Sequence, residues 1–276
     1  MYRDNYGLAD YHVHPDFSFD ARGTVDEYCQ AALKKGLVEI CFTSHFDTNP
    51  MLRDEEKMIR IDGELMPFTV GKLRHYAEMV RQAHEKYFPR GLAVKCGLEA
   101  GYYPGCESLL KEYFEAIEFD YRLGAIHEVG QIELCYEKSM DKYCPEMSVE
   151  ELVGKYFELV AAACRSGYFD AIAHFDLYKR FGRKYYGDKT ATVHRELIGP
   201  VFEAMVESET GLELNTSALR KGMDEYYPSM DIVNMARSAG VRIVAMGSDA
   251  HRPEEVGYDL EGAATIAHEL FPYCDE

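Results

Sequence analysis

Histidines and carboxylates stand at the ends of short apolar runs along this 276-residue chain. Two histidines, His12 and His14, follow the first run. The later residues of this kind are His45, Glu99, His127, His174, Glu213 with Asn215, and Asp249 with His251. Imidazole and carboxylate groups without thiolates are donors that suit Zn, Mn or Fe in hydrolytic sites. The residue types therefore predict a metal centre with hydrolytic chemistry.

The spacing within two pairs indicates shared ions. Residues two apart in a strand point to the same side, so His12 and His14 can approach one ion, and Asp249 and His251 repeat the spacing. One tetrahedral ion cannot use all of these groups. We therefore expect two or three divalent ions. The remaining histidines fall inside segments of helical pattern, where we expect surface or packing roles: His75, His84, His194 and His268.

The apolar runs and the segments between them indicate how these groups are positioned. Strands are predicted at residues 7–11, 38–42, 93–97, 121–126, 170–173, 211–216 and 241–247. Helices are predicted at residues 25–35, 70–87, 107–117, 149–166, 191–208, 230–239 and 254–269. Such regular alternation predicts an α/β fold with parallel strands. Seven units favour a (β/α)7 barrel over an open sheet, with the metal site at the C-terminal ends of the strands, where barrel enzymes carry their chemistry.

Two of the predicted helices carry start and stop signals. Thr24 is followed three residues later by Glu27, and Ser148 is followed in the same way by Glu151. This spacing predicts a capping box, in which each of the two side chains bonds the other residue's backbone N–H. Glycines at 36 and 167 mark the ends of these helices.

Two connections differ from the short loops elsewhere. Residues 46–67 form a long charged segment, which is either a lid or substrate loop or a solvated excursion. Residues 176–189 carry five basic side chains directly after His174, at Lys179, Arg180, Arg183, Lys184 and Lys189. In an acidic chain this reversal of charge indicates an anion-facing loop, although a solvated basic helix end is the simpler alternative.

Composition limits the classes of partner. The formal net charge of −18 repels phosphate backbones, so we expect no nucleic acid partner. No apolar run is long enough to span a membrane, and no signal peptide is evident. The eight cysteines include no CxxC pair, which favours a cytoplasmic protein with reduced thiols. The length suits one domain over residues 1–276, and the oligomeric state stays open.

Six motifs in order resemble the polymerase and histidinol phosphatase (PHP) superfamily. They are residues 10–14 (DYHVH), 43–45 (TSH), 97–99 (GLE), 125–127 (AIH), 173–176 (AHFD) and 247–251 (GSDAH). Within that superfamily the chain is similar to the histidinol-phosphate phosphatases, chiefly through residues 213–222 (ELNTSALRKG). The resemblance spans nearly the whole chain and implies a single distorted (β/α)7 barrel of PHP type.

The resemblance also implies a ligand set. His12, His14, Glu99 and Asp249 would hold one ion, Glu99, His127 and His174 a second, and Asp20, His45 and His251 a third. Two positions depart from the family pattern. Asp20 stands where many of these phosphatases have His, and Ser44 stands where a carboxylate is usual.

The activity implied is hydrolysis of L-histidinol phosphate to L-histidinol and phosphate through a metal-activated hydroxide, as a step of histidine biosynthesis. Glu99, Asp249 and His251 are the expected catalytic residues, with Asp249 or a water protonating the leaving oxygen. Arg220, Lys221 and Arg180 are expected to contact phosphate. Glu213, Asn215 and Asp176 are candidates for the amine and imidazole of histidinol, and Glu213 is equally suited to orienting a metal ligand.

Other activities stay open. The first alternative is a PHP phosphoesterase acting on another small phosphate ester or nucleotide, or a polymerase-type exonuclease, although no aromatic-basic stacking pattern is present. An amidohydrolase also begins with His-x-His on a barrel, but this chain has His127 where that family commonly uses Lys. A metal-dependent binding module would hold metal without turnover.

Overall fold

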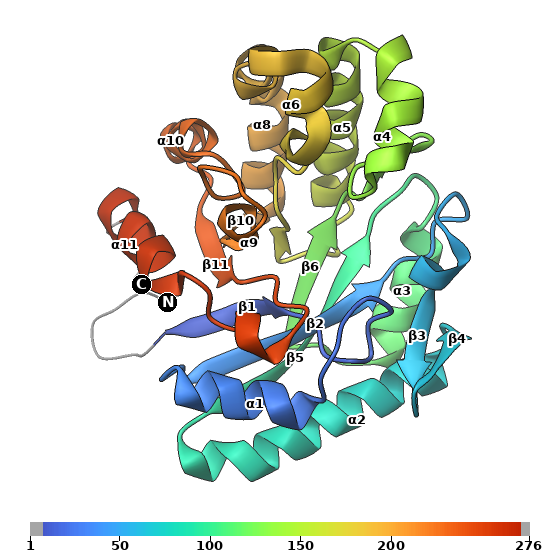
Figure 1. The fold of residues 1–276 in the computed structure, drawn as a ribbon, viewed down its shortest axis with the longest axis vertical. Coiled ribbons are helices and arrows are strands. Elements are labelled where there is room, and N and C mark those ends of the chain that lie inside the picture. Colours follow the sequence, from blue (N-terminus) through green and yellow to red (C-terminus); the bar gives the residue numbers. More distant parts are fainter. Residues whose placement is uncertain (1–7, 272–276) are drawn as a thin grey trace.

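Seven parallel strands form the central sheet of the protein (Figure 1). The structure is a computed structural model that describes residues 8–271, so Gly7, where the first predicted strand begins, and Cys274 lie outside it. In spatial order, which is also chain order, the strands are β1 (Ala9–Val13), β2 (Glu39–Phe46), β5 (Ala93–Gly101), β6 (Tyr121–Ala125), β9 (Ala171–Ile172), β10 (Gly211–Asn215) and β11 (Ile243–Gly247). The predicted parallel α/β architecture is confirmed.

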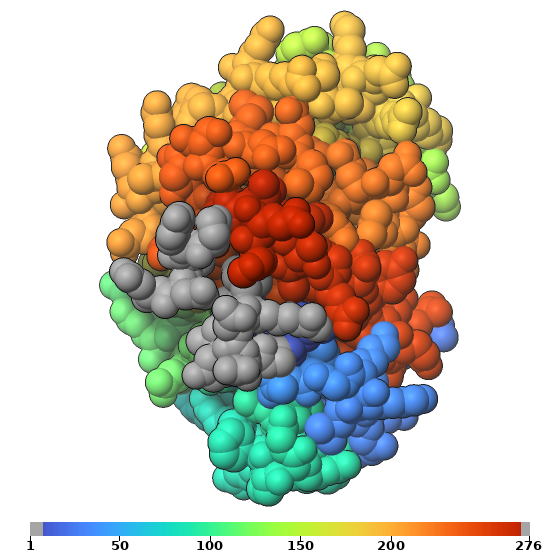
Figure 2. Space-filling model, turned by 90° about the vertical axis from the view of Figure 1, so that its left-hand side faces the viewer, coloured from blue at the N-terminus to red at the C-terminus, as the bar shows by residue number. Residues whose placement is uncertain are grey.

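The first and last strands meet at their carboxyl ends. Val13 and Ala250 form a parallel bridge, and the His14 N–H donates to the Ala250 carbonyl at 2.8 Å. The sheet is therefore nearly closed, as a distorted (β/α)7 barrel requires, and its carboxyl ends face a common centre. Figure 2 shows the consequence on the surface, where the C-terminal segment in red lies against the N-terminal third in blue.

Helices surround this sheet (Figure 1). They are α1 (Val25–Lys34), α2 (Val70–Tyr87), α3 (Glu107–Ala116), α4 (Glu137–Tyr143), α5 (Val149–Arg165), α6 (Lys179–Tyr186), α7 (His194–Leu197), α8 (Gly199–Ser208), α9 (Ser217–Arg220), α10 (Met230–Ala239) and α11 (Leu260–Leu270). Within the described part of the chain, no helix combines the length and apolar character that a membrane span needs. All seven cysteines described are unpaired thiols.

The two capping boxes differ in outcome. At α1 the Thr24 hydroxyl accepts from the Glu27 N–H at 3.3 Å, and the Glu27 carboxylate accepts from the Thr24 N–H at 2.7 Å. At α5 the Ser148 hydroxyl accepts from the Glu151 N–H at 3.1 Å. The Glu151 carboxylate instead binds the Lys155 ammonium at 2.7 Å, because a charged partner one turn away competes for it.

Two predicted helices are interrupted. The segment predicted at 191–208 is split into α7 and α8, because Pro200 in the first turn of α8 has no N–H to continue the preceding turn. The segment predicted at 254–269 begins as a short 3₁₀ turn, Pro253–Glu255, and the α-helix starts only at Leu260. Between them Gly257 adopts a positive φ of 66°, which is incompatible with continuous helix.

Two strands are longer than predicted. β2 continues past His45 and β5 continues past Glu99, and these two residues face each other in register. A strand is held by backbone hydrogen bonds, so a polar side chain does not end it when that side chain points into a site. The predicted boundaries at 42 and 97 were therefore too early.

The long connection after β2 is partly structured. It contains a 3₁₀ turn, Asp54–Lys57, and a hairpin of β3 (Met58–Ile61) and β4 (Glu64–Pro67). Another short hairpin, β7 (Glu128–Val129) and β8 (Ile132–Glu133), follows β6. Each hairpin belongs to a connection that leaves the carboxyl end of a barrel strand.

Candidate metal centre

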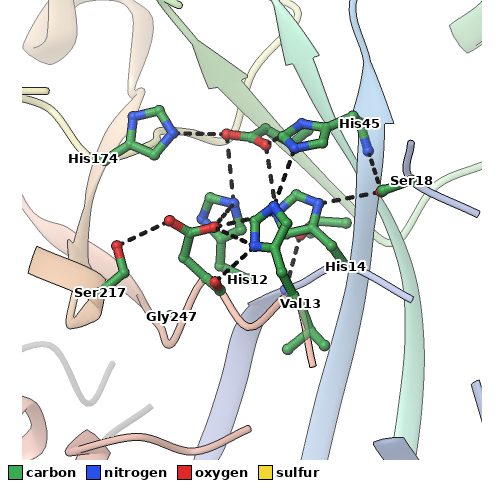
Figure 3. A network of polar contacts seen from close by, with 12 residues as sticks. His12, Val13, His14, Ser18, His45, His174, Ser217 and Gly247 are labelled. Atoms are coloured by element: carbon green, nitrogen blue, oxygen red, sulfur yellow. Dashed lines mark hydrogen bonds and ion pairs between the residues drawn. The ribbon is translucent and has the colours of Figure 1, made fainter. Parts of the chain in front are cut away.

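The nine predicted metal-binding residues come together at the carboxyl ends of the strands. His12 lies on β1, His45 on β2 and Glu99 on β5, and the other six follow β1, β6, β9 and β11. His12, His14 and Glu99 are fully buried. Figure 3 shows His12, His14 and His45 side by side, with His174 approaching from the opposite direction. Residues far apart in the chain thus form one cluster.

The first predicted group has the spacing of a shared ion. His14 Nε2 lies 3.5 Å from both Glu99 Oε2 and Asp249 Oδ1. His12 Nε2 lies 3.5 Å from Glu99 Oε1 and 3.8 Å from Asp249 Oδ1. Two donors that each bind a tetrahedral zinc ion at about 2.0–2.2 Å are roughly 3.3–3.6 Å apart. These four side chains can therefore hold one ion.

Glu99 also faces the second predicted group. Its Oε1 atom lies 2.9 Å from His174 Nε2 and 3.4 Å from His127 Nε2. Its Oε2 atom lies 2.8 Å from His45 Nδ1. A carboxylate with imidazoles around both of its oxygens is placed to bridge two ions, as in two-metal hydrolytic sites.

The third group lies at the open side of the cluster. Asp20 Oδ1 is 3.6 Å from His45 Nε2, and Asp20 Oδ2 is 3.3 Å from His251 Nε2. The two imidazole nitrogens are 3.4 Å apart. The His14 ring stacks against both of these rings, with centroid distances of 4.2 Å to His45 and 4.3 Å to His251. Asp20 is therefore brought together with both of its predicted partners.

Buried donor atoms in the cluster fit metal ligation. Among the buried atoms without a hydrogen-bond partner in the described part of the chain are His12 Nε2 and His14 Nε2. An unpaired buried nitrogen or oxygen costs free energy unless another group, such as an ion, satisfies it. The residues present thus suit divalent cations, since their unpaired atoms face one another at ligand spacing.

Burial and the neighbouring charges shift the pKa values of the side chains in the cluster. Burial, together with the neighbouring His45 and His251, lowers the pKa of His14 well below its ordinary value, which favours the neutral imidazole that binds metals. Burial alone would raise the pKa of Glu99, but nearby imidazoles, His12 and His45 among them, lower it well below its ordinary value. Glu99 is thus held as a carboxylate.

Glu213 and Asn215 support the ligands from behind rather than lining the cavity. Glu213 Oε1 lies 2.6 Å from His12 Nδ1, and Glu213 Oε2 accepts from the His174 N–H at 2.8 Å. The Asn215 amide donates to Glu213 Oε2 at 3.0 Å. A side chain at Gly247 would meet Glu213 Oε1 at 2.3 Å, so this glycine makes room for the carboxylate. Their position fits ligand orientation better than contact with substrate.

Two candidate ligands adopt a strained backbone. His174 has a φ of 29° and Asp249 a φ of 52°, in the left-handed region that residues other than glycine rarely occupy. Such conformations gather at functional sites, where the surrounding structure imposes them. Ser217 donates to Asp249 Oδ2 at 2.9 Å, and Lys221 Nζ lies 2.9 Å from the same atom.

A cavity of about 340 Å³ opens above the cluster. Besides candidate ligands, its wall contains residues that the sequence analysis did not single out: Phe19, Asp47, Leu52, Arg53, Glu56, Glu133, Cys135 and Leu177. Most of them come from the segment after β2 and from the segment after β6. Apart from Asp47, which stands two residues after His45, they follow no spacing rule, because they are brought together by the packing of loops.

The predicted phosphate-binding residues fall into two classes. Arg180 and Lys221 line the cavity, but Arg220 does not. The Arg220 guanidinium donates to the carbonyls of Ser248 and Asp249 at 2.8 and 2.9 Å, and so holds the turn that carries Asp249. We expected Arg220 to contact phosphate, and the structure places it behind the site instead.

The basic segment at 176–189 presents one cation to the cavity. Lys179 is buried and binds Asp176 at 2.9 Å, which removes both from the cavity wall. Lys184 binds Glu137 and Asp141 on α4. Among the five basic residues of this segment, only Arg180 lines the cavity.

Comparison with known proteins agrees with this arrangement. The model of the PHP domain matches residues 10–217. The chain belongs to the PHP family. A "probable histidinol-phosphatase" of Deinococcus radiodurans is 34% identical over 257 residues, which cover 93% of this PHP protein and 91% of the relative. The histidinol-phosphatase of Lactococcus lactis is 26% identical over 266 residues, or 93% and 89% of the two chains.

Solved structures extend the comparison to the fold. The crystal structure of the Lactococcus lactis histidinol phosphate phosphatase, "complexed with ZN, L-histidinol and phosphate", superposes with a TM-score of 0.76. It shares 22% identity with this PHP protein and covers 97% of this chain and 95% of its own. A putative histidinol phosphatase from Listeria monocytogenes also gives a TM-score of 0.76, at 18% identity, covering 92% of this chain and 99% of its own. At these identities the likeness shows the PHP-type barrel.

Proposed function

We propose that this PHP protein is a histidinol-phosphatase, which hydrolyses L-histidinol phosphate to L-histidinol and phosphate in the histidine biosynthesis of the cytoplasm. The observation that carries the proposal is a cavity with buried histidines and carboxylates at its base and with Arg180 and Lys221 in its wall. The relatives of similar length, one of them 34% identical, bear the same activity in their names. Arg180 and Lys221 beside a group of histidines and carboxylates that can hold divalent cations favour an anionic group of the substrate at this place, in a chain whose net charge is −18.

We assign His12, His14, Asp20, His45, Glu99, His127, His174, Asp249 and His251 to two or three divalent ions of Zn, Mn or Fe. The zinc named for the Lactococcus lactis complex supports zinc as one of them. When bound, such ions neutralise phosphoryl oxygens and make a water molecule acidic enough to attack phosphorus. The protein's part is to hold these side chains at ligand spacing in a buried site.

Arg180 and Lys221 are assigned to the phosphate oxygens. Arg180 forms no ion pair with any residue between 8 and 271, and its guanidinium lies over the Phe181 ring at 5.0 Å. Its charge is therefore available to an anion. Lys221 Nζ contacts Asp249 Oδ2 at 2.9 Å while it lines the cavity, so it reaches both the metal ligands and a bound phosphate. Arginine pairs with phosphate through two hydrogen bonds, which also fixes its orientation.

The part of the cavity wall formed by Leu52, Arg53, Glu56, Glu133 and Leu177 suits the organic half of L-histidinol phosphate. Glu56 and Glu133 stand there with Arg53, whose Nε lies 3.4 Å from Glu133 Oε2 and whose terminal nitrogen lies 2.6 Å from Glu56 Oε1. Two carboxylates against one guanidinium leave an excess of negative charge. Leu52 and Leu177 add apolar surface. L-Histidinol carries an ammonium group and a flat imidazole, which match this negative charge and apolar surface.

Phosphate release from L-histidinol phosphate tests the proposal. The protein is stripped with a chelator and reloaded with Zn, Mn or Fe, and a nucleoside monophosphate and an aryl phosphate are measured in parallel. We expect metal-dependent turnover with a strong preference for L-histidinol phosphate. Turnover of the other esters alone would support a different PHP phosphoesterase. Tight metal binding without turnover of any ester would indicate a binding module.

A further inference from the structure

A carboxylate that was not among the predicted ligands lies beside two of them. Asp47 directly follows β2 and is 3% exposed. Its Oδ1 atom lies 3.1 Å from His127 Nδ1, and its Oδ2 atom lies 3.6 Å from His45 Nδ1. The closer contact is a hydrogen bond, and it reaches the His127 ring on the side opposite to Glu99.

Gly101 provides the space that Asp47 occupies. β2 and β5 pair in register, with Phe46 opposite Ala100, so Asp47 comes next to Gly101 at the strand ends. A methyl group at Gly101 would lie 2.0 Å from Asp47 Oδ1, which is far inside van der Waals contact. The Asp47 carboxylate can therefore occupy this position only because residue 101 has no side chain.

This contact selects one form of the His127 ring. A neutral imidazole carries its proton on one nitrogen and a lone pair on the other. A carboxylate can only accept, so the hydrogen bond requires the proton to be on Nδ1. The Nε2 lone pair is then left on the side of Glu99 Oε1, 3.4 Å away, where an ion would be shared.

His12 has the same arrangement toward the same oxygen of Glu99. Its Nδ1 atom contacts Glu213 Oε1 at 2.6 Å, its Nε2 atom faces Glu99 Oε1 at 3.5 Å, and Gly247 leaves the room for Glu213. Two carboxylates, each facing a glycine, thus orient two imidazoles toward one bridging carboxylate. This repetition argues that the Asp47 contact serves the site, rather than the loop in which Asp47 lies.

We propose that Asp47 is a positioning residue of the metal centre, which holds His127 as a metal ligand, with Gly101 as the gap that admits it. The inference rests on the metal centre proposed above but not on the identity of the substrate. Carboxylates in this position typically change metal affinity or activity by about 10- to 100-fold when removed.

Metal affinity measured without substrate tests the role of Asp47. Zinc binding to Asp47→Ala, Asp47→Asn and Gly101→Ala is compared with the unmodified protein by competition with a chromophoric chelator. We expect Asp47→Ala to weaken one ion by about 10- to 100-fold. Asp47→Asn keeps an oxygen that can accept from Nδ1–H, so it should retain most of the affinity. Gly101→Ala should behave like Asp47→Ala, because the methyl group displaces the carboxylate.

A double-mutant comparison tests whether Asp47 acts on zinc affinity through His127. In a His127→Ala background, Asp47→Ala should change zinc affinity little further, since the ring that it orients is absent. Asp54→Ala, in the same connection with a side chain 93% exposed, is the matched control and should bind zinc normally. Circular dichroism establishes whether each variant folds. If Asp47→Ala does not fold, the zinc affinity of Gly101→Ala decides whether Asp47 positions His127.

Two results would overturn the inference. One is unchanged zinc affinity in both Asp47→Ala and Gly101→Ala, and the other is an equal loss in the presence and absence of His127. Failure of the unmodified protein to bind zinc, manganese or iron would instead remove the metal centre itself. The two failures are distinguishable, because the first leaves the metal centre of the unmodified protein intact.

Discussion

The floor and the mouth of the cavity are built in different ways. The floor comprises His12, His14, Glu99, His127, His174 and Asp249, which lie on strands or within a few residues of their carboxyl ends. The mouth comprises Leu52, Arg53, Glu56, Glu133 and Cys135, which lie on the connections after β2 and β6. A barrel separates these tasks, because its strands fix reactive groups rigidly while its loops vary in length and sequence.

The contacts that hold the two regions differ accordingly. On the floor, buried carboxylates such as Glu213 contact imidazoles at distances as short as 2.6 Å. At the mouth, the Arg53 guanidinium lies 4.7 Å from the centre of the Tyr136 ring. Arg53 is 38% exposed, so water weakens its ion pairs. Changes on the floor should therefore alter chemistry, and changes at the mouth should alter substrate preference.

The largest effect is expected on the floor, from Glu99→Gln. The carboxylate faces imidazoles through both oxygens, and an amide cannot neutralise the ions that those imidazoles would share. Loss of several kcal/mol of charge stabilisation corresponds to about a 1,000-fold or greater fall in kcat/KM for L-histidinol phosphate. Steady-state kinetics with metal analysis measures this. Glu115→Gln on α3, 70% exposed, is the control. Near-normal activity with full metal content would contradict the assignment of Glu99.

Arg180 stands between the two regions, and its replacement should have the next largest effect. Hydrogen bonds to a charged group contribute about 1.5–3 kcal/mol, so Arg180→Ala should lower kcat/KM by roughly 10- to 100-fold. Arg180→Lys should recover only part of the loss, because an ammonium cannot form the paired contact. Inhibition by inorganic phosphate should weaken in parallel. Arg183→Ala, with a side chain 74% exposed, should leave both quantities unchanged. Equal behaviour of the two variants would argue against a phosphate role.

Glu133→Gln tests most directly whether the mouth controls substrate preference while the floor controls the chemical step. Removing one of the two carboxylates at the mouth should raise KM for L-histidinol phosphate by about 10-fold, the effect of one charged contact. An aryl phosphate has no cationic group, so its hydrolysis should change little. The ratio of the two kcat/KM values is the measurement. A proportional loss on both substrates would mean that Glu133 acts through the metal centre rather than through the organic half of the substrate.

The same division explains what the sequence could predict. The floor was accessible because parallel strands end on one side of a barrel, so His45, Glu99 and His174 could be placed together from their positions alone. Asp47 was missed because the predicted strand ended at residue 42 and residues 46–67 were interpreted as a connection, although Asp47 stands two residues after His45, the spacing that paired His12 with His14. Arg220 shows that residue type and position in the chain do not decide what a side chain contacts. A basic residue near a site can contact an anion or backbone carbonyls, and only the packing of α9 against β11 decides between them.

Two differences between the predicted and the observed helices could have been foreseen from the sequence. The Gly199-Pro200 pair signals the break between α7 and α8, and Gly257 signals the late start of α11. The geometry of the mouth could not have been predicted in this way. It depends on contacts between two connections, such as that of Asn49 with Glu128, whose positions follow from the packing of the whole barrel.

The smallest expected effect concerns the link between the two regions. Arg60 on β3 is half-buried and donates to the carbonyls of Asp16, Ser18 and Phe19 at 3.0, 2.7 and 2.5 Å. These carbonyls belong to the loop that carries Asp20. Arg60→Gln removes most of these bonds, which should lower the free energy of unfolding by about 1–3 kcal/mol. Because Asp20 lies at the open side of the cluster, kcat/KM should fall only a few-fold.

Thermal unfolding and kinetics at several metal concentrations measure both effects of Arg60→Gln. Arg74→Gln is the matched control, since Arg74 lies on the exposed side of α2 and contacts a single carbonyl at 3.4 Å. If Arg60 acts through the loop of Asp20, added metal should restore activity without restoring stability. Activity and stability that fall together and are not rescued by metal would show that β3 and β4 support the whole barrel, and the separation of floor and mouth would then be less complete than their chain positions indicate.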